Sequence, residues 1–183
     1  MTRLQAIDPE AMSPEQRQVY DDIISGPRGK LQGPFNSWLR SPELCGRAQQ
    51  LGAFCRFNSS LPSRLSELAI LTVARHMTCQ VEWYLHEPIA RDAGVSADVI
   101  EAIKERQTPD FVGDDERAIY TAVKELLETH HMSDSAYSDA LAHFDERGVV
   151  DLVGIVGYYI FVALTLNGFE VPVPDAADPP LAY

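Results

Sequence analysis

A long apolar segment near the C-terminus constrains the fold of this 183-residue chain more than any other feature. Residues 149–169, VVDLVGIVGYYIFVALTLNGF, approach the length that spans a membrane. The segment nevertheless carries Asp151, Thr165 and Asn167, and it has no basic flank beyond Arg147. We therefore interpret it as the central helix of a bundle or as a helix buried in an oligomer, and we expect no membrane as a partner.

Helix start and stop signals punctuate the rest of the chain. The sequence SPE occurs at residues 13–15 and again at 41–43, and each copy places a capping serine before a proline of the first turn. Gly94 and Gly148 are expected to end or separate helices, and no alternating pattern with hairpin turns predicts a strand. We predict an all-α fold of about eight helices, at residues 13–25, 41–58, 63–76, 78–93, 96–106, 114–130, 133–146 and 149–169.

The length of the chain predicts one domain over residues 1–183, with an irregular N-terminal segment and a proline-rich C-terminal tail. The loop at residues 26–37 either covers a pocket or simply connects two helices, and the plain connector is the more frequent case. The tail, FEVPVPDAADPPLAY, either orders on a neighbouring subunit or stays disordered.

Charge and cysteine content narrow the partners and the compartment. The net charge of −12 argues against nucleic acid and anionic membranes, and it leaves a small-molecule substrate as the expected partner. The three cysteines, Cys45, Cys55 and Cys79, form no CxxC motif, and no secretory leader is recognisable at the start of the sequence. We therefore expect a reducing, cytoplasmic location.

Chemistry-bearing residues concentrate between residues 66 and 94. Cys79, Glu82 and His86 are spaced 3 and 4 residues apart, so they share one stripe of a helix, with Trp83 on an adjoining stripe. Glu67 lies in the preceding apolar run, where a carboxylate has few water-facing neighbours in sequence. A glutamate close to such a stripe is a candidate for general acid/base chemistry.

At these residues the sequence resembles the AhpD-like superfamily, which includes the alkylhydroperoxidases and the γ-carboxymuconolactone decarboxylases. Glu67, Cys79, Glu82 and His86 fall on the key positions of that superfamily: a glutamate, then positions 12, 15 and 19 residues further on. The resemblance extends from about Gly33 to the C-terminal sequence GYYIFVALTLNGF. The peroxidases carry CxxC followed by histidine, whereas Glu82 stands here in place of the second cysteine, which is closer to the decarboxylase-like members.

The resemblance implies an AhpD-like helical bundle that removes CO2 from a small γ-lactone bearing a carboxylate, a reaction that needs no cofactor. It implies that Glu67, Glu82 and His86 are catalytic, and we expect Cys79 and Trp83 to line the pocket. It also implies a homo-oligomer, a trimer or hexamer.

Other readings of the same residues remain open. Glu67 could complete a capping box at the start of its helix, and Glu82 and His86 could form an ordinary surface pair. Cys79 could act alone as a peroxidase thiol, although a resolving thiol is missing. The Glu/His set could also serve an isomerase or hydratase, or the chain could be a non-catalytic, oligomeric ligand-binding member.

Histidines outside this motif could bind a metal ion, and two arginines could bind a substrate carboxylate. His76, His130 and His131 lack the HExxH and CxxC…H spacings of zinc sites, so we expect no metal. Arg40 and Arg75 are possible anchors for a substrate carboxylate, although each is more often a surface or ion-paired residue.

Overall fold

The computed structural model describes residues 2–182, which fold into eight α-helices and contain no strand, so the all-α prediction is confirmed. A π-helix, η2 (Phe54–Asn58), continues α3, and short 3-10 turns lie at Pro9–Ala11 and Pro174–Ala176. The α-helices are α1 (Pro14–Ser25), α2 (Phe35–Trp38), α3 (Pro42–Ala53), α4 (Ser63–His76), α5 (Gln80–Asp92), α6 (Ala97–Lys104), α7 (Asp114–Thr129) and α8 (Asp134–Gly168).

The number of α-helices agrees with the prediction only because one unpredicted helix offsets two predicted helices that form a single one. The sequence did not predict α2, a single turn that begins within the predicted loop at residues 26–37 and ends at Trp38. Conversely, α8 covers two predicted helices, and the break between them lies at Asp145, where φ is 56°, and not at Gly148. The Asp145 carboxylate accepts a hydrogen bond from the Gly148 backbone N–H at 3.0 Å, so it acts as an N-cap for the second half of α8.

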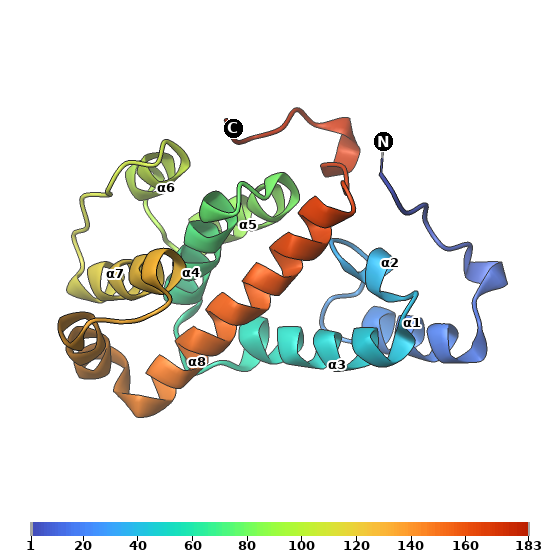
Figure 1. Cartoon of the computed structure of the whole chain (residues 1–183), viewed down its shortest axis with the longest axis horizontal. Helices are drawn as coiled ribbons and strands as arrows, with labels where there is room; N and C mark the ends of the chain where they lie inside the picture. The colour runs from blue at the N-terminus through green and yellow to red at the C-terminus, as the bar shows by residue number, and fades with distance from the viewer. Residues whose placement is uncertain (1, 183) are drawn as a thin grey trace.

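Helices α4 and α8 form the centre of the molecule. Every side chain from Leu65 to Arg75 of α4 is buried, and α4 packs against α5, α7 and α8. Figure 1 shows α8 crossing the molecule diagonally, with α1 to α3 on one side and α6 and α7 on the other. Among the described residues, α8 alone is long and apolar enough to cross a membrane, and 61% of its apolar window is buried within the fold. Its interpretation as a core helix therefore accounts for its composition.

The C-terminal tail packs on its own chain. Gln80, the first residue of α5, donates its side-chain amide to the Leu181 carbonyl at 2.9 Å and accepts from the Leu181 N–H at 2.8 Å. The guanidinium of Arg75 donates to the Ala182 carbonyl at 3.1 Å, and the Leu181 side chain is buried. These contacts fix the end of the tail beside the turn between α4 and α5.

Candidate active site

The turn between α4 and α5 brings two predicted site residues together. Only residues 77–79 separate the two helices, so the chain reverses and α5 packs along α4. As a result Glu67 Oε2 lies 2.7 Å from His86 Nδ1. Glu67 and His86 are only 3% and 7% exposed, so water hardly weakens this contact. The capping-box and surface-pair readings are therefore wrong.

An aromatic ring of α8 completes the environment of His86. The Tyr159 ring meets the imidazole edge to face, with centroids 5.1 Å apart and an angle of 89° between the planes. Burial raises the pKa of the Tyr159 phenol well above its ordinary value, and the charges of Glu67 and Glu82 raise it further. Tyr159 is therefore a neutral wall that holds the imidazole against Glu67.

Glu82 is the most unusual side chain in the site. It is 1% exposed, and neither carboxyl oxygen has a hydrogen-bond partner among residues 2–182. Burial raises the pKa of Glu82 well above 4.5, its ordinary value; the nearby Cys79 thiol, a weak donor, lowers it somewhat, and the charge of Glu67 raises it again. Its environment therefore favours the protonated carboxyl group, the form that can donate a hydrogen bond.

Glu82 and His86 line one pocket, which encloses about 480 Å³ of empty space, its open mouth included. Glu67 lies behind His86 and does not line the pocket itself. The loop at residues 26–37, which the sequence left open as a pocket cover or a plain connector, covers one side of the pocket, because Arg28 and residues 32–35 belong to the lining. Apolar side chains supply much of the rest: Leu85, Ile89, Val162 and Leu166.

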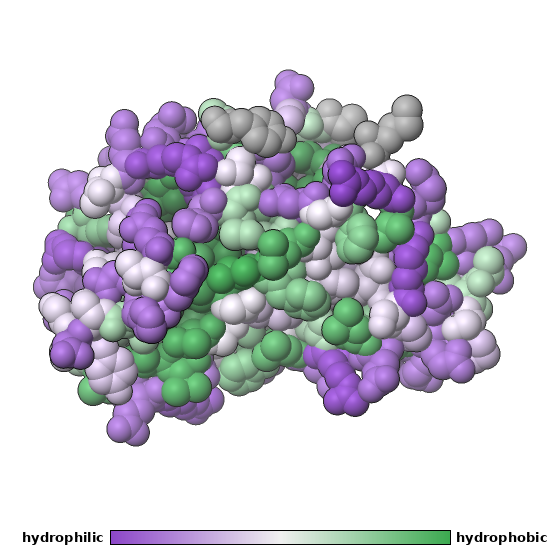
Figure 2. Space-filling model, viewed as in Figure 1, coloured by the Kyte–Doolittle hydropathy of each residue, from purple (hydrophilic) through white to green (hydrophobic). Residues whose placement is uncertain are grey.

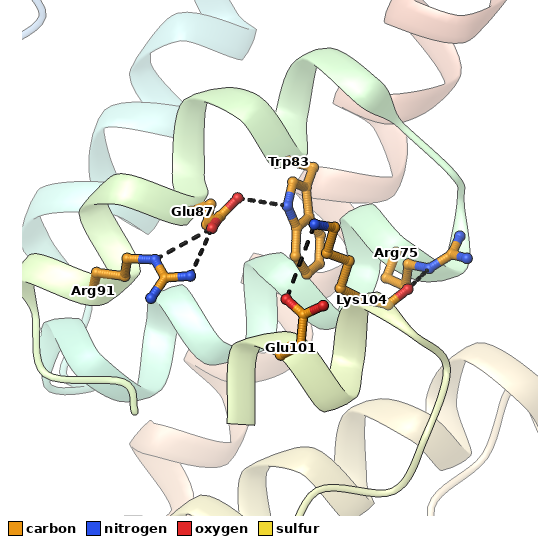
Figure 3. A network of polar contacts seen from close by, with 6 residues as sticks. All are labelled: Arg75, Trp83, Glu87, Arg91, Glu101 and Lys104. Carbon is orange, nitrogen blue, oxygen red and sulfur yellow. Dashed lines mark hydrogen bonds and ion pairs between the residues drawn. The ribbon is translucent and has the colours of Figure 1, made fainter. Parts of the chain in front are cut away.

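Cys79 and Trp83 were expected to line this pocket, and the structure corrects both assignments. Cys79 is the N-cap residue that precedes α5 rather than a residue on its helical face, and burial raises the pKa of its thiol well above the ordinary range. Trp83 is fully buried, and its side chain lies outside the pocket lining. Its indole N–H donates a hydrogen bond to the Glu87 carboxylate at 3.0 Å, and this carboxylate also accepts from Arg91 (Figure 3). Trp83 is thus part of the core beside the site.

The arginines proposed from sequence as carboxylate anchors are also corrected. Arg75 donates to the Lys104 carbonyl at 2.6 Å (Figure 3), and Arg40 donates to the carbonyls of Gln5 and Asn36. Both guanidinium groups hold backbone segments together. The arginines that line the pocket are Arg28 and Arg56, which sequence reasoning missed. Both lie outside the regular helices, so no helical spacing linked them to His86.

Within residues 2–182, no group of three or more His, Cys, Asp or Glu side chains is arranged to hold a metal ion. His86 uses one ring nitrogen for Glu67, and the three cysteines are free thiols that are each buried. The chemistry that the described side chains can supply is proton transfer and hydrogen bonding from a neutral carboxyl group.

Solved structures share this arrangement of helices. The chain superposes on an uncharacterized peroxidase-related protein from Ralstonia eutropha JMP134, an alkylhydroperoxidase AhpD core, with a TM-score of 0.78 at 13% identity, covering 95% of this chain and 93% of that one. The debrominase Bmp8 in complex with 2,3,4-tribromopyrrole gives 0.75 at 15% identity, covering 96% and 94%. A protein of unknown function from Agrobacterium tumefaciens gives 0.66 at 20% identity, covering 78% and 99%. The fold is therefore AhpD-like.

The sequence comparison points in the same direction as the fold. Residues 42–125, which include α4 and α5 with Glu67, Glu82 and His86, match the Carboxymuconolactone decarboxylase family. This match covers the residues whose spacing resembles that family, and it agrees with the AhpD-like fold. No curated protein matches the sequence significantly.

Proposed function

We propose that this protein is a carboxy-lyase that removes CO2 from a small carboxylated lactone, similar to 4-carboxymuconolactone, without the help of a cofactor. One observation carries the proposal: a buried Glu67–His86 pair, 2.7 Å apart, stands beside the proton-holding carboxyl of Glu82, and His86 and Glu82 line one pocket. The match of residues 42–125 to the Carboxymuconolactone decarboxylase family supports it, and the debrominase neighbour, solved in complex with a brominated pyrrole, supports a small ring as the ligand.

The first step breaks the bond between the ring carbon and the leaving carboxylate. The electron pair passes through the ring double bond onto the lactone carbonyl oxygen as CO2 departs. An apolar surrounding favours this step because it leaves the carboxylate poorly solvated, and Leu85, Ile89 and Val162 supply such a surface. The protonated Glu82 donates a hydrogen bond to the oxygen on which charge develops.

The second step returns a proton to carbon. Glu67 accepts a hydrogen bond from the Nδ1–H group of His86, so Nε2 is the ring nitrogen left to exchange a proton with the substrate. The Glu67 charge stabilises the imidazolium from which the proton is delivered. Glu82 and His86 then have different roles, hydrogen-bond donor and proton donor, within one pocket.

A thiol peroxidase finds less support. Such chemistry needs a thiolate, and burial raises the pKa of all three cysteine thiols, that of Cys45 and of Cys55 to about 11. Cys79 also lies outside the pocket lining. Its neighbour on the helix, Glu82, offers a proton rather than a resolving thiol.

The test is a panel of carboxylated γ-lactones incubated in D2O, with CO2 release and deuterium incorporation followed together. We expect stoichiometric CO2 and one deuterium on a ring carbon over which the electron pair was delocalised. General acid/base groups contribute about 10²–10⁴-fold, so His86→Gln should lose turnover in that range. His131→Gln is the matched control, because His131 is exposed and should retain full activity. Turnover of no lactone in the panel, or an active His86→Gln protein, would contradict the proposal.

A further inference from the structure

The strongest unexplained feature of the pocket is the guanidinium of Arg28. Its Nε and Nη2 atoms are buried, and neither has a hydrogen-bond partner among the described residues. Burial lowers the pKa of Arg28, yet an arginine stays charged in proteins, so the fold holds a poorly solvated cation without an anion beside it. Such an arrangement is unfavourable unless a ligand supplies the missing partner.

The unpaired atoms have the geometry of a carboxylate receptor. Nε and Nη2 form one edge of the guanidinium, where two N–H bonds point in parallel and match the two oxygens of a carboxylate. The planar face of the group is already occupied, because its central carbon lies 4.8 Å from the centre of the Phe35 ring and 5.9 Å from that of Phe57. The aromatic contacts therefore orient Arg28, while its Nε and Nη2 edge makes no hydrogen bond within residues 2–182.

A glycine creates the space for this arrangement. A Cβ atom at Gly52 of α3 would lie 2.7 Å from Arg28 Nη2 and closer still to the hydroxyl of Tyr158, so any side chain there would displace both groups. Burial raises the pKa of Tyr158 well above its ordinary value, which keeps the phenol neutral beside the cation. Tyr158 lines the pocket together with Arg28.

The other ionisable groups of the pocket are compatible with an anion. Arg56, on the π-helix η2, adds a second positive charge to the pocket. Burial raises the pKa of Glu82 and so favours its neutral form, which does not repel an anion. His86 becomes positive when it is protonated. A local positive potential thus opposes the net charge of −12 of the whole chain.

We propose that Arg28 binds a substrate carboxylate side-on through Nε and Nη2, and that this carboxylate is retained through the reaction. The leaving carboxylate cannot be the one bound there, because a paired charge is stabilised in the ground state and loses CO2 more slowly. The leaving group belongs instead near Leu85, Ile89 and Val162. The inference rests on the proposed function only in taking the bound carboxylate to be the substrate's.

Binding of benzoate and of its neutral isostere benzamide tests the site without turnover. We expect the wild-type protein to bind benzoate at least tenfold more tightly in an NMR titration, and the Arg28 Nε–H signal to shift with benzoate alone. Arg28→Gln should remove the preference and leave benzamide binding unchanged. Arg47→Gln is the matched control, because Arg47 is exposed on α3 and paired with Glu43.

The denaturation midpoint separates this role from a structural one. Since Arg28→Gln removes an unpaired buried charge, the midpoint should not fall. Equal affinity of the wild-type protein for benzoate and benzamide, an unmoved Nε–H signal, or a lower midpoint with the benzoate preference intact would each overturn the inference. Failure of the proposed function can be told apart from failure of this inference. His86→Gln should keep the preference for benzoate. If the wild-type protein prefers benzoate but decarboxylates no lactone, the Arg28 site stands and the proposed function does not.

Discussion

At the scale of single residues, the site is defined by carboxyl groups that differ in environment. Glu67 faces His86 at 2.7 Å, while Glu82 is buried without a hydrogen-bond partner among the described residues. Two buried carboxyl groups near each other cannot both ionise easily. Glu67 has the imidazole as its partner, so Glu82 is the one that keeps its proton.

This difference predicts how stability depends on pH. Because the folded protein raises the pKa of Glu82, it retains a proton that the unfolded chain releases above about pH 4.5. The free energy of unfolding should therefore fall as pH rises from there toward the folded pKa, by up to about 1.4 kcal/mol per pH unit. Glu82→Gln should remove that dependence.

Urea unfolding of the wild-type and Glu82→Gln proteins between pH 5 and pH 8 measures the effect. The advantage of the variant should grow with pH, whereas Glu105→Gln, at an exposed position, should follow the wild-type curve. Parallel curves for wild type and Glu82→Gln would mean that Glu82 ionises normally in the folded protein.

The sequence pointed to Glu67, Glu82 and His86 but not to the two arginines of the pocket. Glu82 and His86 are four residues apart on one helix, so local periodicity was enough to place them on one face. Arg28 and Arg56 lie in a loop and a π-helix, and their approach to the pocket depends on how distant segments pack. Trp83 and Glu87 are also four residues apart on α5, but which side of this helix faces the pocket depends on packing, and periodicity could not exclude Trp83 from the lining.

At the scale of elements, helix existence was predicted better than helix boundaries. Prolines and serines at helix starts are local signals, and α1, α6 and the second-last predicted helix begin where they indicate. The break in α8 depends on Asp145, which adopts a positive φ and caps the helix that follows. A glycine was the expected residue for that position, since glycine tolerates positive φ most easily.

The loop before α2 also shows what local sequence signals cannot predict. Its glycines and prolines identified it correctly as irregular, but they could not say what it covers. The answer came from its contacts, since Arg28 and Phe35 lie against the pocket that Glu82 and His86 also line. A covering loop and a plain connector have the same local signals and differ only in what the fold places beneath them.

At the scale of the whole molecule, one surface remains unusually apolar. Val150, Val153 and Leu164 of α8 are 69%, 45% and 57% exposed and share one side of the helix. Figure 2 shows hydrophobic side chains gathered along the course of α8. Leu51 of α3 is also exposed. Such surfaces mark subunit interfaces.

We propose that this surface joins copies of the chain into a trimer or hexamer. Light scattering at micromolar concentration should then give three or six times the 20.3 kDa mass of one chain. Leu164→Glu should lower the measured mass, because a buried unpaired charge opposes association. Val112→Glu is the control, since Val112 is fully exposed on a loop. A monomeric wild-type protein would refute the assembly.

The most direct test of the account is whether Glu82 and His86 act as one unit. A double-mutant cycle compares kcat on a carboxylated lactone substrate for wild type, Glu82→Leu, His86→Gln and the double variant. Each single variant should lose about 10²–10⁴-fold, with KM less affected, and the double variant should lose little more than the worse single one. Additive losses, or full activity in Glu82→Leu, would contradict the proposed coupling of the two residues within one pocket.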